Sequence, residues 1–261
     1  MFHTVSNTAL ALMHPRGLMA TRPLRPNLAP AACSALSGVQ RLLLGLLLTG
    51  LWVTVLATLL APPPLRAWDM QQMRAAAQRM GPGAVAALVP LQNMLVEGRG
   101  QDDDARLLAV NQFYNLRIDF KSDLEVWGQE DYWATPLQSL AAGRGDCEDY
   151  VIAKYTTLLA MGMPRTRLRL VYVRARMSDA PAPVAHMVLA YYATPTAEPL
   201  ILDNLRADVL PASQRADLTP VFSFNSDGLW QGVGHASAGD PMARLSRWRD
   251  TWQRIQQEGF L

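Results

Sequence analysis

A cysteine stands between acidic residues in the glycine-rich segment GRGDCEDY, residues 143–150. The apolar spacing of Val151, Tyr155 and Leu158 predicts a helix that begins near Cys147 and buries this face. A helix N-terminus carries about half a positive charge, which stabilises a thiolate, and its free N–H groups bind a developing oxyanion. The segment therefore suits a cysteine nucleophile, although a buried free cysteine more often serves as a small apolar residue.

A thiolate nucleophile needs an imidazole that takes and returns a proton, and a polar group that orients the imidazole. From Asp69 onward the sequence has two histidines, His186 in the apolar run AHMVLAYY and His235 in a Gly- and Ser-rich stretch. Asp203 lies in the apolar run LILDNL, where an unpaired carboxylate is costly. If the two runs are neighbouring strands, His186 and Asp203 lie side by side. The order Cys147, His186, Asp203 supports a catalytic role for the three residues about as strongly as it supports a purely structural role for each of them.

Three carboxylates flank the cysteine, from Asp146, Glu148 and Asp149. Such hard oxygen ligands are the kind that Ca²⁺ prefers. The alternative is that Asp146 caps the helix while Glu148 and Asp149 complement its dipole. Three negative charges beside a thiolate should, however, raise the pKa of Cys147 unless a cation offsets them. A bound Ca²⁺ would supply that charge.

The basic residues are unevenly distributed, although the formal net charge is +2. Residues 1–68 contain five arginines and no Asp, Glu or Lys, so the rest of the chain holds 19 basic against 22 acidic residues. The part from Asp69 onward is therefore slightly acidic, which removes the electrostatic motive for binding nucleic acid. Two cysteines exclude a disulfide framework and a four-thiolate zinc site.

The run 42–61 is uncharged and mostly aliphatic, and its 20 residues span about 30 Å as a helix, close to one hydrocarbon core. Arginines precede it, so the positive-inside rule predicts that residues 1–41 form a cytoplasmic leader. We expect 42–61 to be a transmembrane anchor or a signal h-region, with the anchor favoured because the run is long. A buried core helix is the less favoured alternative. The domain 68–261 then lies outside the cytoplasm, tethered to the membrane.

This domain has helical patterns first and strand patterns afterwards, which predicts an α+β fold with a largely antiparallel sheet. A final amphipathic helix carries Trp248 and Trp252, which we expect to pack onto the body. The expected helices are 69–80, 84–96 with a break at Pro90, 105–116, 147–161 and 242–258, and the expected strands are 168–173, 185–192, 199–205, 221–224 and 229–231.

The arrangement of Cys147, His186 and Asp203 resembles that of the papain-like, transglutaminase-like superfamily. More closely, the sequence resembles the bacterial transglutaminase-like cysteine proteinases of the LapG type. The similarity covers roughly residues 85–235. Its motifs are WATP at 133–136, GRGDCEDY at 143–150, LRLVY at 168–172, HMVL at 186–189, LDNL at 202–205 and PVFSFN at 220–225.

The resemblance implies a papain-like core with Cys147 as nucleophile, His186 as general base and acid, and Asp203 as the orienting carboxylate. It also implies dependence on calcium, with Asp146, Glu148 and Asp149 as candidate ligands. The implied activity is a periplasmic endopeptidase that cuts the N-terminal region of a large surface adhesin at a di-alanine site and so promotes biofilm release. The implied inhibitory partner is the periplasmic domain of a membrane-bound cyclic-di-GMP receptor.

Two other readings remain open. A transglutaminase or amidase acting on periplasmic or peptidoglycan substrates would use the same three residues, because both chemistries pass through a thioester. A catalytically silent periplasmic binding module would instead keep Cys147 as a structural residue.

Overall fold

The computed structural model describes residues 68–234 and 236–261, together with Gly38 and Leu43. The predicted cytoplasmic leader, the predicted anchor or signal segment and His235 therefore lie outside the described residues, apart from these two positions. Within the described part of the chain, no helix combines the length and the apolar character needed to cross a bilayer.

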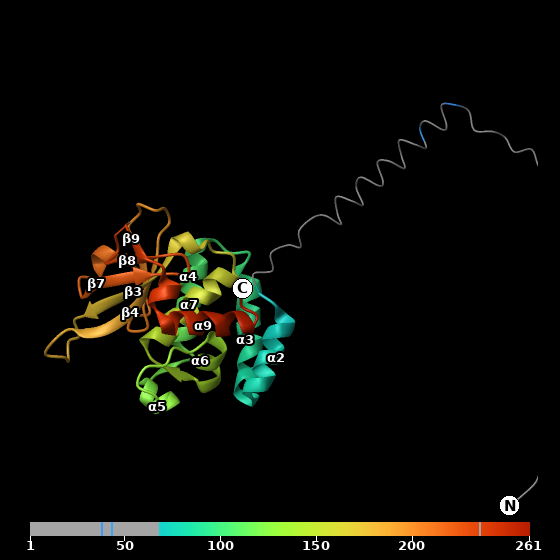
Figure 1. Cartoon of the computed structure of the whole chain (residues 1–261), viewed down its shortest axis with the longest axis horizontal. Coiled ribbons are helices and arrows are strands. Elements are labelled where there is room, and N and C mark those ends of the chain that lie inside the picture. Colours follow the sequence, from blue (N-terminus) through green and yellow to red (C-terminus); the bar gives the residue numbers. More distant parts are fainter. Residues whose placement is uncertain (1–37, 39–42, 44–67, 235) are drawn as a thin grey trace, which may run out of the picture. The chain divides into compact units, whose positions relative to one another are not determined.

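Helices make up the first half of the described domain, as the sequence predicts (Figure 1). The first begins after Asp69, whose carboxylate accepts hydrogen bonds from the backbone N–H groups of Gln71 and Gln72 and so caps the helix. Asp102 caps a later helix in the same way by accepting from Ala105. The helices are α2 (Met70–Met80), α3 (Pro82–Gly98), α4 (Asp103–Asn115), α5 (Asp123–Trp127), α6 (Pro136–Ala142) and α7 (Cys147–Ala160).

The expected break at Pro90 is wrong, because α3 continues through this residue to Gly98. A proline within a helix removes one backbone hydrogen bond and crowds the preceding turn. In α3, Leu88, Leu91 and Leu95 on both sides of Pro90 are buried in the core. This packing holds the helix together across the proline.

The second half of the domain forms a seven-stranded sheet in which every pairing is antiparallel. The strand order is β6-β5-β4-β3-β7-β8-β9. This confirms the predicted α+β class. The strands are β3 (Leu168–Ala175), β4 (Val184–Tyr191), β5 (Leu200–Leu202), β6 (Leu210–Pro211), β7 (Leu218–Phe224), β8 (Leu229–Gln231) and β9 (Ser237–Gly239). A separate parallel pair joins β1 (Asp119–Phe120) to β2 (Arg144–Gly145), and single 3-10 turns lie at Arg165–Arg167 and Ala212–Gln214.

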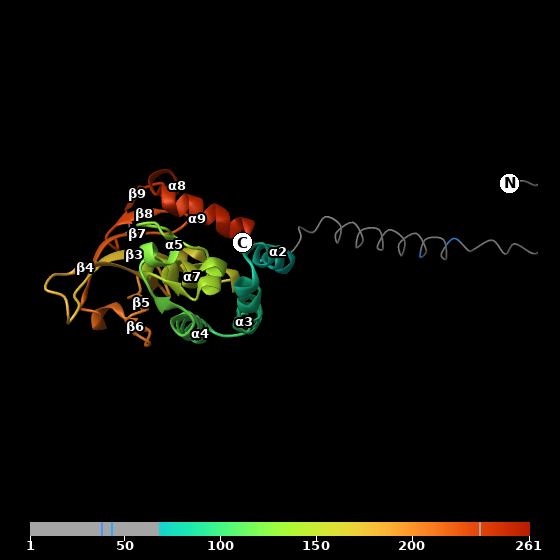
Figure 2. The same cartoon turned by 90° about the horizontal axis from the view of Figure 1, so that it is seen from below.

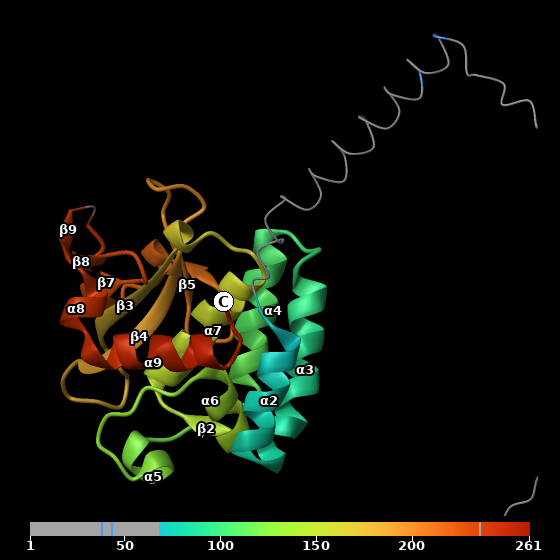
Figure 3. The same ribbon diagram turned by 45° about the vertical axis from the view of Figure 1, so that its right-hand side comes forward.

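Helix α7 lies between the sheet and the helical layer, as Figures 2 and 3 show, and most of its side chains are buried. Met187 and Leu189 of β4 belong to the main core with α7. Val188 and Ala190 belong to a second, smaller cluster, because successive side chains of a strand point to opposite faces. The sheet thus has one face on α7 and a second apolar face away from it.

The C-terminal helix predicted over 242–258 is two helices, α8 (Pro241–Arg244) and α9 (Ser246–Gln257). Trp248 and Trp252 are buried, and their rings lie 5.7 Å and 6.1 Å from the ring of Tyr155 in α7. The predicted packing of these two tryptophans onto the body is therefore confirmed.

Glu258, the residue that follows the last turn of α9, carries a buried carboxyl group. Its carboxylate is buried, accepts a 2.8 Å hydrogen bond from the Thr135 hydroxyl, and has its second oxygen without a partner among the described residues. Burial raises the pKa of Glu258 to about 7 from 4.5. Because the folded-state pKa is the higher one, this group stabilises the fold at low pH, and that contribution is lost as the pH rises from about 4.5 through 7.

We therefore expect Glu258→Gln to become more stable than the wild type as the pH rises across this window. Urea unfolding of both proteins at intervals between pH 4.5 and 8 measures the difference. A difference that stays constant with pH would show that Glu258 is not the titrating group.

Candidate active site

Cys147 is the first residue of α7, where the sequence places it. The preceding segment is fixed by β2, because the N–H of Asp119 donates to Gly143 and the N–H of Lys121 donates to Gly145. A Cβ atom at Gly145 would lie 2.6 Å from the Asp149 carboxylate, so glycine is required there. The backbone hydrogen bonds and this close approach hold the turn, which presents Cys147 at the positive end of the helix dipole.

The thiol of Cys147 is half-buried and donates to Glu148 Oε2 at 2.6 Å. The Tyr172 hydroxyl of β3 donates to the other oxygen, Oε1, also at 2.6 Å. Burial raises the pKa of Cys147, and the charges of Glu148 and Asp146 raise it further, while the backbone N–H of Met187 acts in the opposite direction. The sulfur is thus held as a thiol in this arrangement, with α7 facing β4.

His186 of β4 and Asp203, which follows β5 directly, form a buried pair with Nε2 and Oδ1 2.8 Å apart. Burial alone would raise the pKa of Asp203, but hydrogen bonds from His186, from the Leu205 N–H and from Arg215 lower it to about 2. An ionised carboxylate can only accept, so Nε2 carries the proton and the other ring nitrogen, Nδ1, is left as the basic atom. The expected side-by-side placement of His186 and Asp203 is what the structure shows.

The Met187 backbone joins the two halves of the site, because its N–H lies at the Cys147 sulfur and its neighbour in β4 is His186. Among the residues that the structure describes, the Cys147 thiol donates its hydrogen bond to Glu148 and makes none to His186. The structure therefore brings Cys147 to the strand that carries His186, with the thiol turned to the carboxylate.

Arg215 is a residue of this site that the sequence analysis missed. Its Nη2 donates to Asp203 Oδ2 at 2.7 Å and to Asp217 Oδ2 at 2.8 Å, and its Nε donates to Asp217 Oδ1 at 3.1 Å. Only 3% of the residue is exposed. It lies in the polar stretch SQRAD, and nothing in that pattern distinguishes a buried arginine from a surface one.

Helix α4 holds the backbone after Asp203. Asn115 donates to the carbonyl of Asp203 at 2.8 Å, and Asn111 donates to the carbonyl of Ala207 at 2.9 Å. Lys154 of α7 in turn donates to Asn111 Oδ1 at 2.8 Å, and its burial lowers its pKa to about 7. These amides position the carboxylate that faces His186.

Asp123, Asp146 and Asp149 form an acidic cluster beside the nucleophile, each offering one oxygen within 4.8 Å of the other two. One oxygen of Asp123 accepts from the Tyr132 N–H at 2.6 Å, and one of Asp149 accepts from the Ala134 N–H at 2.7 Å.

One oxygen of each of the three carboxylates is buried without a hydrogen-bond partner among the described residues. Burial, together with mutual repulsion, raises the pKa of Asp146 to about 9 and that of Asp149 to about 7, and the pKa of Asp123 is also raised. Unsatisfied buried carboxylate oxygens that converge in this way fit a hard divalent cation such as Ca²⁺.

Two of the three predicted calcium ligands, Asp146 and Asp149, therefore lie together, and Asp123 joins them from α5. Glu148 is not in this cluster, because its oxygens accept from Cys147 and Tyr172, although its charge still raises the pKa of Asp123 and Asp146. No signal in the sequence pointed to Asp123, because its local pattern is that of the first residue of a capped helix.

Two tryptophans, Trp133 and Trp230, lie in different surroundings. Trp133 is buried, stacks on Phe224 with ring centroids 5.9 Å apart, and lines a cavity of about 210 Å³ together with Tyr172 and Phe222. Tyr172, which lines this cavity, donates a hydrogen bond to Glu148, the residue that follows the nucleophile. Trp230 of β8 lies instead under the Arg169 guanidinium at 3.9 Å.

The chain is similar to one protein family and to solved structures of one protein. The model of the family described as bacterial transglutaminase-like cysteine proteinase matches residues 94–222. The chain is 34% identical to Legionella pneumophila LapG, and the calcium-bound structure of that protein superposes with a TM-score of 0.62 over 72% of this chain and 99% of LapG. The EGTA-treated LapG structure gives the same identity and TM-score over 72% of this chain and 97% of LapG. No protein of the curated set matches the chain significantly.

Proposed function

The chain belongs to the family of bacterial transglutaminase-like cysteine proteinases and is a cysteine protease of the LapG type; from this premise we propose that it is a calcium-dependent endopeptidase whose catalytic residues are Cys147, His186 and Asp203. The observation that carries the proposal is the 2.8 Å contact between His186 and Asp203, on the strand that lies against the Cys147 sulfur.

In the proposed reaction, His186 Nδ1 takes the proton of the Cys147 thiol, and the thiolate attacks the carbonyl carbon of the scissile peptide bond. The oxyanion that forms is stabilised by the free N–H groups at the start of α7, including that of Cys147. The imidazolium, which the Asp203 carboxylate stabilises, then protonates the leaving amine. A water molecule, deprotonated by His186, attacks the thioester and releases the new carboxyl terminus.

Calcium enters the proposal through the acidic cluster of Asp123, Asp146 and Asp149. When bound, Ca²⁺ supplies positive charge that compensates these carboxylates, of which Asp146 raises the pKa of Cys147 by its negative charge. The support is the set of three buried oxygens without partners, together with the calcium-bound structure of LapG. Glu148, whose charge acts on the same cluster, is a further candidate ligand.

We expect Asp123→Asn to reverse the order of stability between calcium and chelator. In chelator the variant is more stable than the wild type, because one buried negative charge is removed from a repelling group. In calcium it is less stable, because a ligand at 100 times its Kd stabilises the wild type by about 2.7 kcal/mol. Thermal unfolding in both conditions, with calorimetric titration of calcium, measures this.

Asp179→Asn, at an exposed aspartate in the loop before β4, is the matched control and should respond to calcium as the wild type does. Glu148→Gln, assayed in parallel, decides whether the glutamate belongs to the ligand set. Wild-type calcium affinity in Asp123→Asn would contradict the assignment of this cluster.

The proposed substrate is the N-terminal region of a large cell-surface adhesin, cut at a di-alanine site with release of cells from a biofilm. The proposed location is the periplasm, tethered to the inner membrane through residues 42–61. The proposed inhibitory partner is the periplasmic domain of a membrane-bound cyclic-di-GMP receptor. The support is the family, the arginine-flanked apolar run and the slightly acidic body, which is not suited to nucleic acid.

Mass spectrometry of the products tests the reaction type, because a transglutaminase or amidase would use the same thioester. The full-length protein is incubated with an adhesin fragment that contains the di-alanine site, and with a fragment in which both alanines are replaced by arginine. The proposal expects two new termini at the first site and none in the replaced fragment. Cross-linked or deamidated glutamine with an intact backbone would establish the alternative chemistry.

A further inference from the structure

The sheet face away from α7 encloses a cavity of about 180 Å³. Its floor comes from β3, β4 and β5, whose valine, alanine and isoleucine side chains form the second apolar cluster. Its rim comes from the segments around β6, β7 and β8. The lining is apolar with one exception, Arg215; the other members are Val171, Val173, Val188, Ala190, Pro199, Ile201, Ala212, Leu218, Pro220 and Val233.

Arg215 is nearly fully buried in this lining, and it has an unused donor. Its Nε and Nη2 are engaged by Asp203 and Asp217, whereas Nη1 is buried and has no hydrogen-bond partner among the described residues. Leaving a buried donor without a partner is unfavourable, because the donor has lost its hydrogen bonds to water. A hydrogen-bond acceptor in the cavity would remove this cost.

Two further polar groups share this face of the sheet and are also unsatisfied within the described residues. Ser223 Oγ is buried without a partner, and its residue pairs across the strands with Val171, so the two side chains point to the same face. The Tyr192 hydroxyl is likewise buried without a partner, and Tyr192 belongs to the second apolar cluster. Neither Ser223 nor Tyr192 is among the residues that line the cavity, so Arg215 carries the donor that a ligand there would meet.

Charge and size define the ligand. The guanidinium already faces two carboxylates, Asp203 and Asp217, so the cavity has no net positive charge to attract an anion. A cavity of about 150 Å³ is enough to hold benzene. The volume therefore fits a ring of that size with one additional polar atom.

We propose that this cavity is a binding site for an uncharged, mostly apolar molecule of about the size of a six-membered ring, carrying one oxygen that accepts a hydrogen bond from Arg215. The same guanidinium holds Asp203, so occupancy changes the orientation of the catalytic pair and the rate of turnover. That second consequence rests on the proposed function, whereas the binding does not.

Cyclohexanone is the probe, titrated into full-length protein with methyl-labelled valines and followed by NMR. We expect saturable shifts at the methyl groups of Val171, Val173 and Val188, and no saturation with cyclohexylammonium, which has the same ring but a cationic donor. The Cys147→Ala variant should bind as the wild type does. Binding of cyclohexanone by a wild type that shows no peptidase activity would refute the proposed function and leave the site standing.

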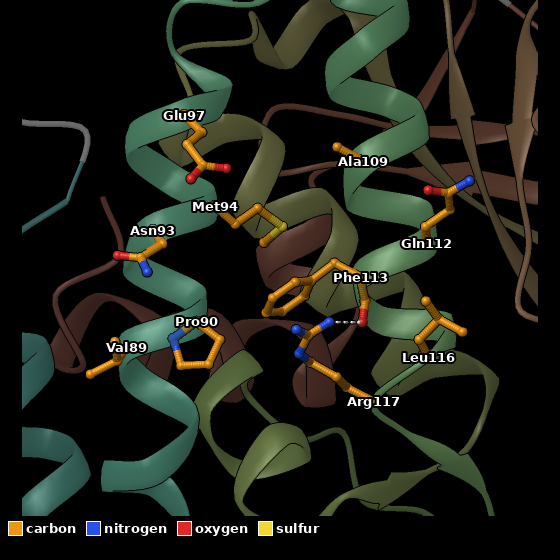
Figure 4. A pocket seen from close by; sticks show the side chains of 10 residues that line it. All are labelled: Val89, Pro90, Asn93, Met94, Glu97, Ala109, Gln112, Phe113, Leu116 and Arg117. Atoms are coloured by element: carbon orange, nitrogen blue, oxygen red, sulfur yellow. Dashed lines mark hydrogen bonds between the residues drawn. The ribbon is translucent and has the colours of Figure 1, made fainter.

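Ala212→Leu fills the cavity and should weaken cyclohexanone binding at least tenfold, and Val233→Phe narrows it from the loop after β8 if the first variant does not fold. The matched control is Ala109→Leu, at an alanine lining a different cavity, between α3 and α4 (Figure 4). The control should bind as the wild type does. Unsaturable shifts, equal shifts in Ala212→Leu and Ala109→Leu, or tighter binding of cyclohexanecarboxylate than of cyclohexanone would overturn the proposal.

Discussion

Replacing His186 with alanine should reduce kcat by a factor on the order of 10⁶, and Asp203→Asn should reduce it by a factor on the order of 10⁴. The two effects differ because the alanine removes the proton acceptor itself. The amide introduced by Asp203→Asn would still contact the ring, but it can donate to Nε2 and hold the imidazole in the wrong tautomer, as expected when an orienting carboxylate is lost. The measurement is single-turnover cleavage of the adhesin fragment at enzyme excess.

Alkylation of Cys147 across pH provides the accompanying readout, with Cys33→Ser as the background so that one thiol reacts. In calcium, the pKa of the Cys147 thiol should be lower than in chelator, because the cation offsets the charge of Asp146, and His186→Ala should lose this lowering. Asp179→Asn controls for the Asp→Asn change at a position remote from the site. Near-normal rates in both His186→Ala and Asp203→Asn would rule out these residues as the catalytic pair.

Arg215→Met should destabilise the protein by about 3–5 kcal/mol, the usual cost of removing one partner from a buried ion pair. The loss leaves the carboxylates of Asp203 and Asp217 without their guanidinium. The free energy of unfolding of Arg215→Lys should lie between those of the wild type and Arg215→Met. The lysine keeps the positive charge, but a single ammonium cannot reproduce the forked guanidinium that reaches both carboxylates. Urea unfolding at pH 7 measures the differences.

The matched control is Arg165→Met, which removes an ion pair with Asp227 in which both side chains are half exposed. Exposed pairs contribute about 0–1 kcal/mol, so this variant should remain close to the wild type. Equal effects of the two replacements would show that the buried pair carries no special weight.

The pH dependence of the Arg215 effect has a definite sign. Asp203 has a pKa of about 2 in the folded protein against 3.8 ordinarily, and Arg215 is one of the groups that lower it. The resulting stability is present above pH 3.8 and is lost as the pH falls toward 2. The difference between the wild type and Arg215→Met should therefore shrink over that range.

Local signals in the sequence were sufficient to predict much of the fold. Asp69 and Asp102 cap helices because a short carboxylate reaches free N–H groups within three residues, an interaction that needs no distant partner. The strand around His186 and the turn before Cys147 are also local features. They were enough to predict the helix start. They placed His186 beside Asp203 only on the condition that the two strands are neighbours, and the structure supplies that pairing.

The failures of the sequence analysis arise where distant packing decides. Pro90 predicts a break, but buried leucines on both sides of it hold α3 continuous. The predicted C-terminal helix divides at Leu245, which ends α8 and precedes α9. At Pro90 tertiary packing overrides the local signal, whereas at Leu245 a non-helical backbone conformation, with φ −112° and ψ 87°, interrupts the helical period.

The sequence by itself determined the residue types of the chemistry, namely a cysteine at a helix start, a histidine on a strand, an aspartate predicted on the strand 199–205, and acids around the nucleophile. In the structure that strand ends at Leu202, so Asp203 follows it directly. The tertiary structure alone decided which charges meet. Asp123 reaches Asp146 and Asp149 from another helix, and Arg215 reaches Asp203 from a polar loop. The reason is physical: a charged residue is ordinarily exposed, and its burial depends on a partner that the fold supplies, which no local pattern records.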